Sequence, residues 1–362
     1  MANWTTTHTY SPTYPESMRK GTKNHTTFPE FIKYCQIGKK KLKKKLIKKL
    51  KNYYDKVIVG DGYIYCRAVN APCLLTAHMD TVHKVVVQNY YEWTNEKGEH
   101  IIASPDGIGG DDRCGVYMIM KILQTTDLRP AILFCEDEEE GGVGSEKFVK
   151  KTYVDETGEE KTFIEELSNL KYLIELDRAH ADDLVFYDDD NSEFHEFCAD
   201  VTGYIETYGS FSDICNLSPV CGIASVNISC GYHDQHTLRE TVNMEEMYRS
   251  MDVVIKLIRE AQKDETPAYE FVEYKYPFKY TKNYSWGDYY GNYYGDYDYY
   301  NYGTKPTTTA TDTHVIEFTF FMNGIEITTD IICDDEYEGV AKLMINNPTI
   351  CYNYIIDYYW VR

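Results

Sequence analysis

The sequence lacks the features that mark membrane, disulfide-stapled and zinc-ribbon proteins. It has no apolar run of the roughly 20 residues that a membrane-spanning helix needs. Its 11 cysteines are odd in number and include no Cys-x-x-Cys pair. The start, MANWTTTHTYSPTYPES, lacks the charged and apolar regions of a secretory signal. We therefore expect reduced, mostly buried thiols in a cytoplasmic protein, and the frequent Lys, Asn and Tyr point to a bacterium or a phage-infected cell.

Positive charge is also scarce, with 37 Lys and Arg against 58 Asp and Glu and a formal net charge of −21. This balance disfavours nonspecific binding to nucleic acid by the protein as a whole. The exception is GKKKLKKKLIKKLKN, residues 38–52, whose Leu and Ile residues recur at helical spacing. We interpret it as an amphipathic helix with a solvated lysine face, with a membrane or nucleic-acid surface as the alternative. We expect no nucleic-acid or membrane partner.

Four apolar strand patterns run into histidine or acidic residues. APCLLTAHMD contains His78 at its end, PAILFCEDEEEGG runs into acids, LKYLIELD ends at Asp177, and PVCGIASVNIS precedes CGYHDQH. Helical patterns lie between them, at 112–125, 145–151, 161–169 and 243–262. Strands that alternate with helices indicate an α/β sheet with helices on both faces. Since ligands bind at the carboxyl ends of strands in such sheets, we expect the site there.

Composition divides the chain into three parts. Residues 1–265 have the pattern of the main domain, and residues 266–310 form a Tyr/Asp/Gly-rich linker without aliphatic core formers. Residues 311–362 predict a small ββαβ module of the α+β class, with Asn323-Gly324 as its hairpin turn. Because so small a core is marginal on its own, we expect the module to pack on the main domain or on a partner.

The stretch IGGDDRCG, residues 108–115, places two aspartates side by side before the apolar helical run VYMIMKIL. Like charges so close repel unless a cation or hydrogen-bond donors neutralise them. A helix start is the ordinary interpretation, because Asp is a favoured N-cap and suits the positive end of a helix. A metal site is the alternative, and the rest of the sequence favours it.

Five fragments in order carry a resemblance to a known superfamily: HMDTV (78–82), GDDRCG (110–115), EEGGVG (139–144), Asp177 and GYHDQHTLRE (231–240). They resemble the co-catalytic zinc exopeptidases of peptidase families M20, M28 and M42, and most of all the peptidase T-like metallopeptidases. The patterns of that group are HxDT, (A/G)DD(K/R)xG, EExGxxG or EExGxG, a lone Asp and a late His. The resemblance implies a three-layer α/β/α zinc-exopeptidase (phosphorylase/hydrolase-like) fold with a mixed sheet, and a di-zinc hydrolase catalytic domain over residues 1–265.

The resemblance also implies a ligand set for two Zn²⁺ ions, with Co²⁺ or Mn²⁺ as alternatives. Asp111 would bridge the ions, Glu139 would be the general base toward a metal-bridging hydroxide, and Asp80 would accept the second N–H of a ligating histidine. In this superfamily the peptide after the bridging aspartate is often cis, which we expect here too. The implied metal ligands are His78, Asp111, Glu140, Asp177 and His236.

Some assignments stay open in the sequence. Three consecutive glutamates allow two alignments, and the following GGVG favours Glu139 and Glu140 as the base and ligand over Glu138 and Glu139. His233 competes with His236 as the late ligand, and the HTLRE that follows His236 favours the latter.

Three further residues have undecided roles. His83 matches no ligand position and is either structural or in contact with substrate. Arg178 either holds a substrate carboxylate or pairs with acids. Asp213, in GSFSDIC, resembles a GTDA-type segment of the superfamily, which implies a role in positioning.

The resemblance implies a hydrolase of amide bonds, with short peptides as substrates. An aminopeptidase is preferred, because acidic surroundings suit a substrate ammonium. The alternatives are an amidohydrolase that deacylates a small N-acyl metabolite, and a non-catalytic binding protein on a hydrolase fold. Only about 35 residues separate Asp177 from Asp213, too few for the usual lid domain. The tail module or a second subunit of a homo-oligomer would then supply the missing substrate contacts.

Overall fold

The structure is a computed structural model that describes residues 28–68, 70–154 and 158–274, and the backbone of three strands nearer the C-terminus. The chain divides into two compact units, Met1–Tyr294 and Gly295–Arg362, which are described separately. Among the described helices, none combines the length and the apolar character needed to cross a bilayer.

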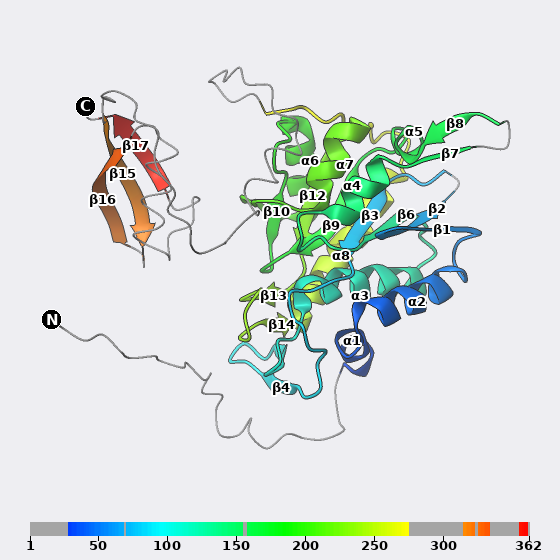
Figure 1. Ribbon diagram of the computed structural model, residues 1–362, viewed down its shortest axis with the longest axis horizontal. Helices are drawn as coiled ribbons and strands as arrows, with labels where there is room; N and C mark the ends of the chain where they lie inside the picture. Colours follow the sequence, from blue (N-terminus) through cyan, green and yellow to red (C-terminus); the bar gives the residue numbers. More distant parts are fainter. Residues whose placement is uncertain are drawn as a thin grey trace, which may run out of the picture. The chain divides into compact units, whose positions relative to one another are not determined.

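An eight-stranded mixed sheet forms the centre of the first unit (Figure 1). Its four central strands, β6, β3, β9 and β12, run parallel, and they are the four strands that the sequence predicts. Their carboxyl ends therefore meet at one edge of the sheet. In sheet order the strands are β1 (Lys56–Gly60), β2 (Tyr63–Arg67), β6 (Ala131–Cys135), β3 (Leu74–His78), β9 (Leu173–Arg178), β12 (Ser225–Ser229), β10 (Asp183–Val185) and β11 (Ile205–Glu206).

Helices cover both faces of this sheet. Neighbouring strand residues point to opposite faces, so Leu75 packs in the same core as Ile119 of α3, whereas Leu74 shares a second core with Phe148 of α4. The three-layer α/β/α architecture with a mixed sheet is thus confirmed. The helices of the first core are α1 (Pro29–Cys35), α2 (Lys39–Leu50), α3 (Gly110–Thr125), α6 (Ser192–Thr202) and α8 (Met244–Ala261). Those of the second core are α4 (Val143–Val149), α5 (Phe163–Leu167) and α7 (Asp213–Cys221).

Two smaller sheets flank the main one. The larger of them holds the fragment 231–240 beside the start of α3, because β13 and β14 pair with each other and β14 pairs with β5. Its strands are β13 (Tyr232–His233), β14 (Thr241–Asn243), β5 (His100–Ala103) and β4 (Tyr91–Thr94). The smaller is a pair, β7 (Thr152–Val154) and β8 (Glu160–Thr162).

The lysine-rich helix α2 packs its leucines into the core, as its sequence pattern predicts. Its lysines do more than face solvent, because Lys39 pairs with Asp137 and Lys43 pairs with Glu136. Both acids belong to the loop that follows β6. Among the ion pairs described, the helix therefore neutralises the first two acids of this loop and not the glutamates that follow them.

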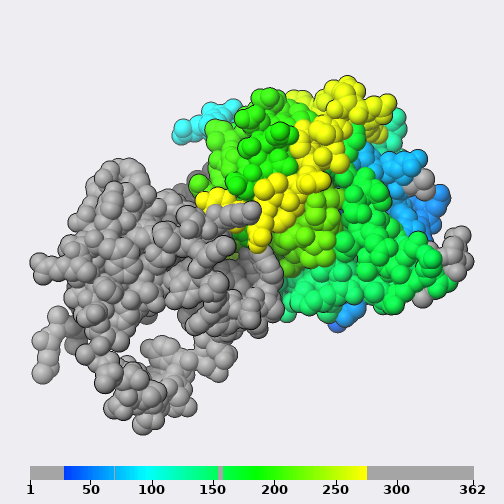
Figure 2. Space-filling view, turned by 90° about the horizontal axis from the view of Figure 1, so that it is seen from above, coloured from blue at the N-terminus to red at the C-terminus, as the bar shows by residue number. Residues whose placement is uncertain are grey.

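Residues 266–274, which we expected to begin the linker, belong to the first unit and pack on the rest of it. Tyr269 donates its N–H to Lys171 at 2.8 Å and accepts from Ala224 at 2.9 Å, and Phe271 donates to Gly222 at 3.1 Å. Figure 2 shows this segment in yellow, lying on the green part of the surface. The rest of the expected linker, 275–310, lies outside the described residues.

The second unit contains a three-stranded antiparallel sheet in the order β16-β15-β17. Its strands are β15 (His314–Met322), β16 (Ile325–Cys333) and β17 (Ile355–Trp360). Met322 pairs with Ile325, on either side of the two residues where the sequence predicts the turn. The helix that we expect between β16 and β17 lies outside the described residues.

Candidate metal centre

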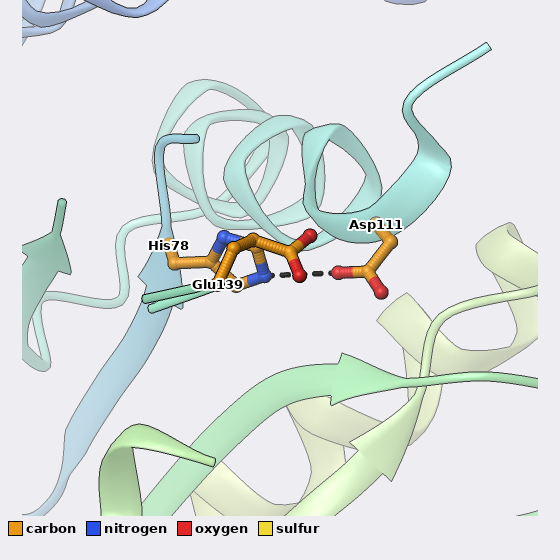
Figure 3. Close-up of side chains that lie close together, drawn as sticks. All are labelled: His78, Asp111 and Glu139. Carbon is orange, nitrogen blue, oxygen red and sulfur yellow. Dashed lines mark hydrogen bonds and ion pairs between the residues drawn. The ribbon is translucent and has the colours of Figure 1, made fainter. Parts of the chain in front are cut away.

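The centre lies where the parallel strands end. β3 ends at His78, which stands opposite Cys135 at the end of β6, and β9 carries Asp177 on the other side of β3. Asp111 comes to the same edge from the first turn of α3. Figure 3 shows the side chains of His78, Asp111 and Glu139 pointing toward one another.

Two histidines share the carboxylate of Asp111. Nε2 of His78 lies 2.9 Å from Oδ1 of Asp111, and Nε2 of His236 lies 3.1 Å from Oδ2. Each oxygen thus faces a different imidazole. A carboxylate that bridges two cations needs this arrangement.

Further carboxylates complete a group around each histidine. Oδ1 of Asp177 lies 3.3 Å from Nε2 of His78, and Oε2 of Glu139 lies 3.0 Å from Nε2 of His236. Two ligand atoms, each about 2.1 Å from a tetrahedral Zn²⁺, lie about 3.4 Å apart. The observed separations of 2.9 to 3.3 Å are therefore close to those of ligands that share an ion.

The centre carries more negative charge than its histidines neutralise. Burial and the charge of Asp111 raise the pKa of Asp177 to about 7, against the attraction of His78. Burial and the charge of Asp177 likewise raise the pKa of Glu138. Hydrogen bonds to Asp111 and Glu139 raise the pKa of His236 to about 10. Such a cluster holds extra protons unless a cation takes their place.

One buried oxygen also fits a cation. Oε1 of Glu139 is buried and has no hydrogen-bond partner within the described part of the chain. Buried carboxylate oxygens are normally satisfied by donors or by metals. Imidazole nitrogens with carboxylate oxygens are standard donors to Zn²⁺, so the residues present fit the implied metal.

Asp112, the second aspartate of the pair, lies outside the ligand group and has its own donors. It is fully buried, and its Oδ2 accepts from the N–H of His78 at 3.1 Å while its Oδ1 accepts from Gly115 at 2.8 Å. It therefore joins the end of β3 to the start of α3. The peptide between Asp111 and Asp112 is cis, as the resemblance implies.

Glu240 fixes the turn that leads into α3. Its side chain is fully buried, with Oε2 accepting from Gly109 at 2.8 Å and Oε1 accepting from Asp111 at 2.9 Å. The same Oε2 lies 2.8 Å from Nε2 of His83, which gives that histidine a structural contact. Glu240 was not among the residues expected from the sequence, where its only signal is its place at the end of GYHDQHTLRE.

Asp80 links His78 to the acidic loop after β6. Its Oδ1 lies 3.6 Å from Nδ1 of His78 and accepts the N–H of Asp137 at 2.7 Å. Its Oδ2 accepts the N–H of Glu139 at 3.3 Å. Burial opposes ionisation of Asp80, but the neighbouring His78 ring outweighs it and lowers the pKa to about 2. Asp80 thus orients both a histidine and a glutamate of the centre.

Replacing Asp80 with Asn is expected to weaken metal binding or activity about 10- to 100-fold, because partners of this kind orient the ligands. Competition against a chelator measures the affinity. Asp61→Asn is the matched control, since Asp61 lies on an exposed turn and pairs only with Lys147 among the ion pairs described. Equal affinity and activity in both variants would contradict the role of Asp80.

The structure places Glu138 and Glu139, and not Glu140, toward the histidines. Oε2 of Glu138 lies 3.8 Å from Nε2 of His78, and Glu139 contacts His236. Glu140 is exposed, and no ion pair joins it to either histidine in the described ranges. The two glutamates that face the histidines thus differ by one residue from the pair, Glu139 and Glu140, that the sequence favours as base and ligand.

The sequence contains a signal for this earlier alignment. Residues 138–144, EEEGGVG, match the longer form EExGxxG with Glu140 at the variable position. The last glycine of that form is Gly144, where an added Cβ would lie 2.4 Å from the carbonyl oxygens of Gly62 and Glu136. Only glycine fits there, and because both forms end at Gly144, this packing is compatible with either alignment.

The remaining open residues also find their places. His233 lies 2.6 Å from Glu246 and is separate from the centre, so of the two late histidines the structure brings His236 to Asp111. Arg178 pairs with Asp183 at 3.1 Å. Of its two proposed roles, pairing with acids is therefore the one seen in the structure.

Two donors to Asp177 were missed in the sequence. The hydroxyl of Ser212 donates to Oδ2 of Asp177 at 2.8 Å, and that of Tyr232 donates to Oδ1 at 3.3 Å. Asp213 follows Ser212, buried at the start of α7. Hydroxyls at these positions have no sequence signal of their own, because their role depends on where α7 and β13 dock.

No protein-family model matches the sequence, and no curated protein matches it. Among solved structures, the chain is similar to an aminopeptidase PepT from Bacillus cereus, at 16% identity and a TM-score of 0.49, over 65% of this chain and 97% of the other. It is similar to a tripeptidase from Staphylococcus aureus at 14% identity and a TM-score of 0.47, over 64% and 96%. A TET aminopeptidase from a marine sediment archaeon of the Thaumarchaeota has 13% identity and a TM-score of 0.45, over 62% and 93%.

Proposed function

We propose that this chain is a metal-dependent hydrolase of amide bonds, and specifically an aminopeptidase that acts on short peptides. The observation that carries the proposal is the carboxylate of Asp111, with one oxygen 2.9 Å from His78 and the other 3.1 Å from His236. A carboxylate shared in this way is what a pair of neighbouring catalytic cations requires.

The proposed centre holds two Zn²⁺ ions, with Co²⁺ or Mn²⁺ as alternatives. His78 and Asp177 would hold one ion, His236 and Glu139 the other, and Asp111 both. Glu139 thus takes the ligand role that the sequence alignment gave to Glu140, and Glu138 takes the role of general base.

Two dications bound here would polarise a substrate carbonyl and lower the pKa of a water molecule. Glu138 would accept the proton of that water, a role supported by its position 3.8 Å from Nε2 of His78 and by the burial that raises the pKa of its carboxyl. It would then return the proton to the leaving amine. Asp80 would keep His78 and the acidic loop in position throughout.

A cavity of about 510 Å³ beside Glu139 and Glu140 has the size to take a small ligand. Its wall is largely the segment that follows Asp80, which supplies apolar side chains for a substrate residue. Glu140, an exposed acid in its lining, favours a substrate ammonium over a carboxylate. The apolar lining includes Val82, Val85, Val86, Val87 and Ile108.

A substrate panel tests the proposal. The protein, reconstituted with Zn²⁺, Co²⁺ or Mn²⁺, is assayed on dipeptides and tripeptides, on the same peptides with acetylated amino termini, and on N-acyl amino acids. We expect hydrolysis of the free peptides and at least a tenfold lower kcat/KM on the acetylated ones, because a blocked amine loses its attraction to the acids.

The other outcomes identify the alternatives. Turnover of N-acyl amino acids alone would make the protein a deacylase of small metabolites. No turnover, together with less than one metal ion per chain, would favour a non-catalytic binding protein on this fold.

A further inference from the structure

A second histidine cluster lies outside the proposed centre. Nδ1 of His180 and Nδ1 of His233 are 3.4 Å apart, with ring centroids 5.4 Å apart at an interplanar angle of 62°. On its other side, Nε2 of His233 lies 2.6 Å from Oε2 of Glu246. Of the two nitrogens that face each other, one belongs to His233, whose other nitrogen contacts a carboxylate, and the other belongs to the exposed His180.

The backbone holds the two rings at this separation. His180 donates its N–H to the carbonyl of Tyr232 at 2.8 Å, and Gly231 donates to the carbonyl of His180 at 2.8 Å. Asn243 caps α8 and fixes Glu246 in its first turn, since its side chain accepts from the N–H of Glu246. Backbone hydrogen bonds between the two segments, together with the first turn of α8, therefore hold the cluster in place.

The contacts set the protonation of the rings. A carboxylate is an acceptor, so Nε2 of neutral His233 carries the proton toward Glu246, and Nδ1 keeps its lone pair. Burial lowers the pKa of His180, which favours the neutral ring with an available lone pair. A histidine with one nitrogen bonded to a carboxylate and the other free is the usual form of a metal ligand.

We propose that His180 and His233 bind a transition-metal ion through their Nδ1 atoms, with Glu246 orienting His233 and water completing the coordination. Two nitrogens about 2.1 Å from a tetrahedral ion lie about 3.4 Å apart, which is the separation found here. Imidazole donors select Zn²⁺, Ni²⁺ or Cu²⁺ over Mg²⁺ and Ca²⁺.

An ion at this site would brace the two segments that carry ligands of the Asp111 centre. His180 lies three residues after Asp177, and His233 lies three residues before His236. The site is distinct from the Asp111 centre, because neither histidine contacts a carboxylate of that centre among the ion pairs described. It therefore adds one ion to whatever number that centre binds.

Counting bound Zn²⁺ in the full chain tests the proposal. The wild-type protein, His180→Ala and His233→Ala are equilibrated with Zn²⁺ at a fixed free concentration, and metal per chain is measured by elemental analysis. His100→Ala is the matched control, because His100 is a half-exposed histidine paired with Glu245 at 2.6 Å. We expect one ion fewer per chain in the first two variants and no change in the control.

Cu²⁺ and a conservative variant provide a second measurement. We expect the two-nitrogen electron paramagnetic resonance signature of Cu²⁺, added after the Asp111 centre is filled with Zn²⁺, to disappear in His180→Ala. Glu246→Gln should keep the ion but weaken its binding about 10-fold, because the ring loses its anionic partner.

Equal Zn²⁺ content in the wild type and in a folded His180→Ala variant would overturn the proposal and leave a direct hydrogen bond between the two rings. Circular dichroism shows whether the variants are folded. The test counts ions relative to the wild type and uses no activity, so its result does not depend on the proposed peptidase function.

Discussion

Replacing Glu138 with Gln is expected to lower kcat on a short peptide by about 10²- to 10⁴-fold, while the metal content of the protein stays the same. Gln keeps the size of the side chain but cannot take a proton from water. Among the ion pairs described, Glu138 is the carboxylate near Nε2 of His78 that the proposed ligand set leaves unused, at 3.8 Å. Single-turnover kinetics with elemental analysis separates lost proton transfer from lost metal.

The two following glutamates supply the controls. Glu139→Gln is expected to weaken binding of one ion, because Glu139 contacts His236. Glu140→Gln should keep the metal content and the kcat of the wild type, because Glu140 is exposed, and should raise only KM, because Glu140 lines the cavity. If Glu140→Gln lost metal and Glu139→Gln lost only turnover, the alignment favoured by the sequence would be right and the one proposed from the structure would be wrong.

The central sheet could be predicted because its strands are buried on both faces. LLTAH, AILFC and SVNIS are buried at every position, and strands of parallel sheets read as continuous apolar runs for that reason. The same runs end at His78 and at the acidic loop, so the sequence also indicated the edge of the sheet at which we propose the site. Strand ends pointed to His78 and Asp177, whereas Asp111 and His236 were named because their fragments resemble the exopeptidase motifs.

Other elements left too little signal. α7 contains Pro219, which in a sequence indicates the end of a helix, yet here it lies inside one. β13 has only two residues, and β10 and β14 only three each, so no alternation can be recognised. These elements form because neighbouring segments dock on them, and their existence depends on the assembled sheet.

The choice among three consecutive glutamates also depends on contacts that are distant in the sequence. All three have the same chemistry, and either glycine spacing of the family pattern can be matched. What decides is the backbone of the loop, where Asp80 accepts the N–H groups of Asp137 and Glu139 and aims Glu139 inward. That contact spans more than 50 residues of sequence, and no local pattern contains it.

Replacing Asp111 with Asn is expected to remove both ions and to reduce activity below detection. The amide keeps the shape of the carboxylate, but it offers one neutral acceptor where two negatively charged oxygens face His78 and His236. A ligand that binds only the folded chain stabilises it by about 4 kcal/mol at 1,000 times its Kd. Saturating Zn²⁺ should therefore raise the Tm of the wild type by several degrees and change that of the variant little.

Asp112→Asn is the matched control for this variant, because Asp112 is the neighbouring buried aspartate and accepts only backbone N–H groups among its hydrogen bonds described. It should keep both ions and the Zn²⁺-dependent rise in Tm. Two bound ions in Asp111→Asn, or their loss in a folded Asp112→Asn, would mean that the shared carboxylate is not the one on which the proposed centre depends.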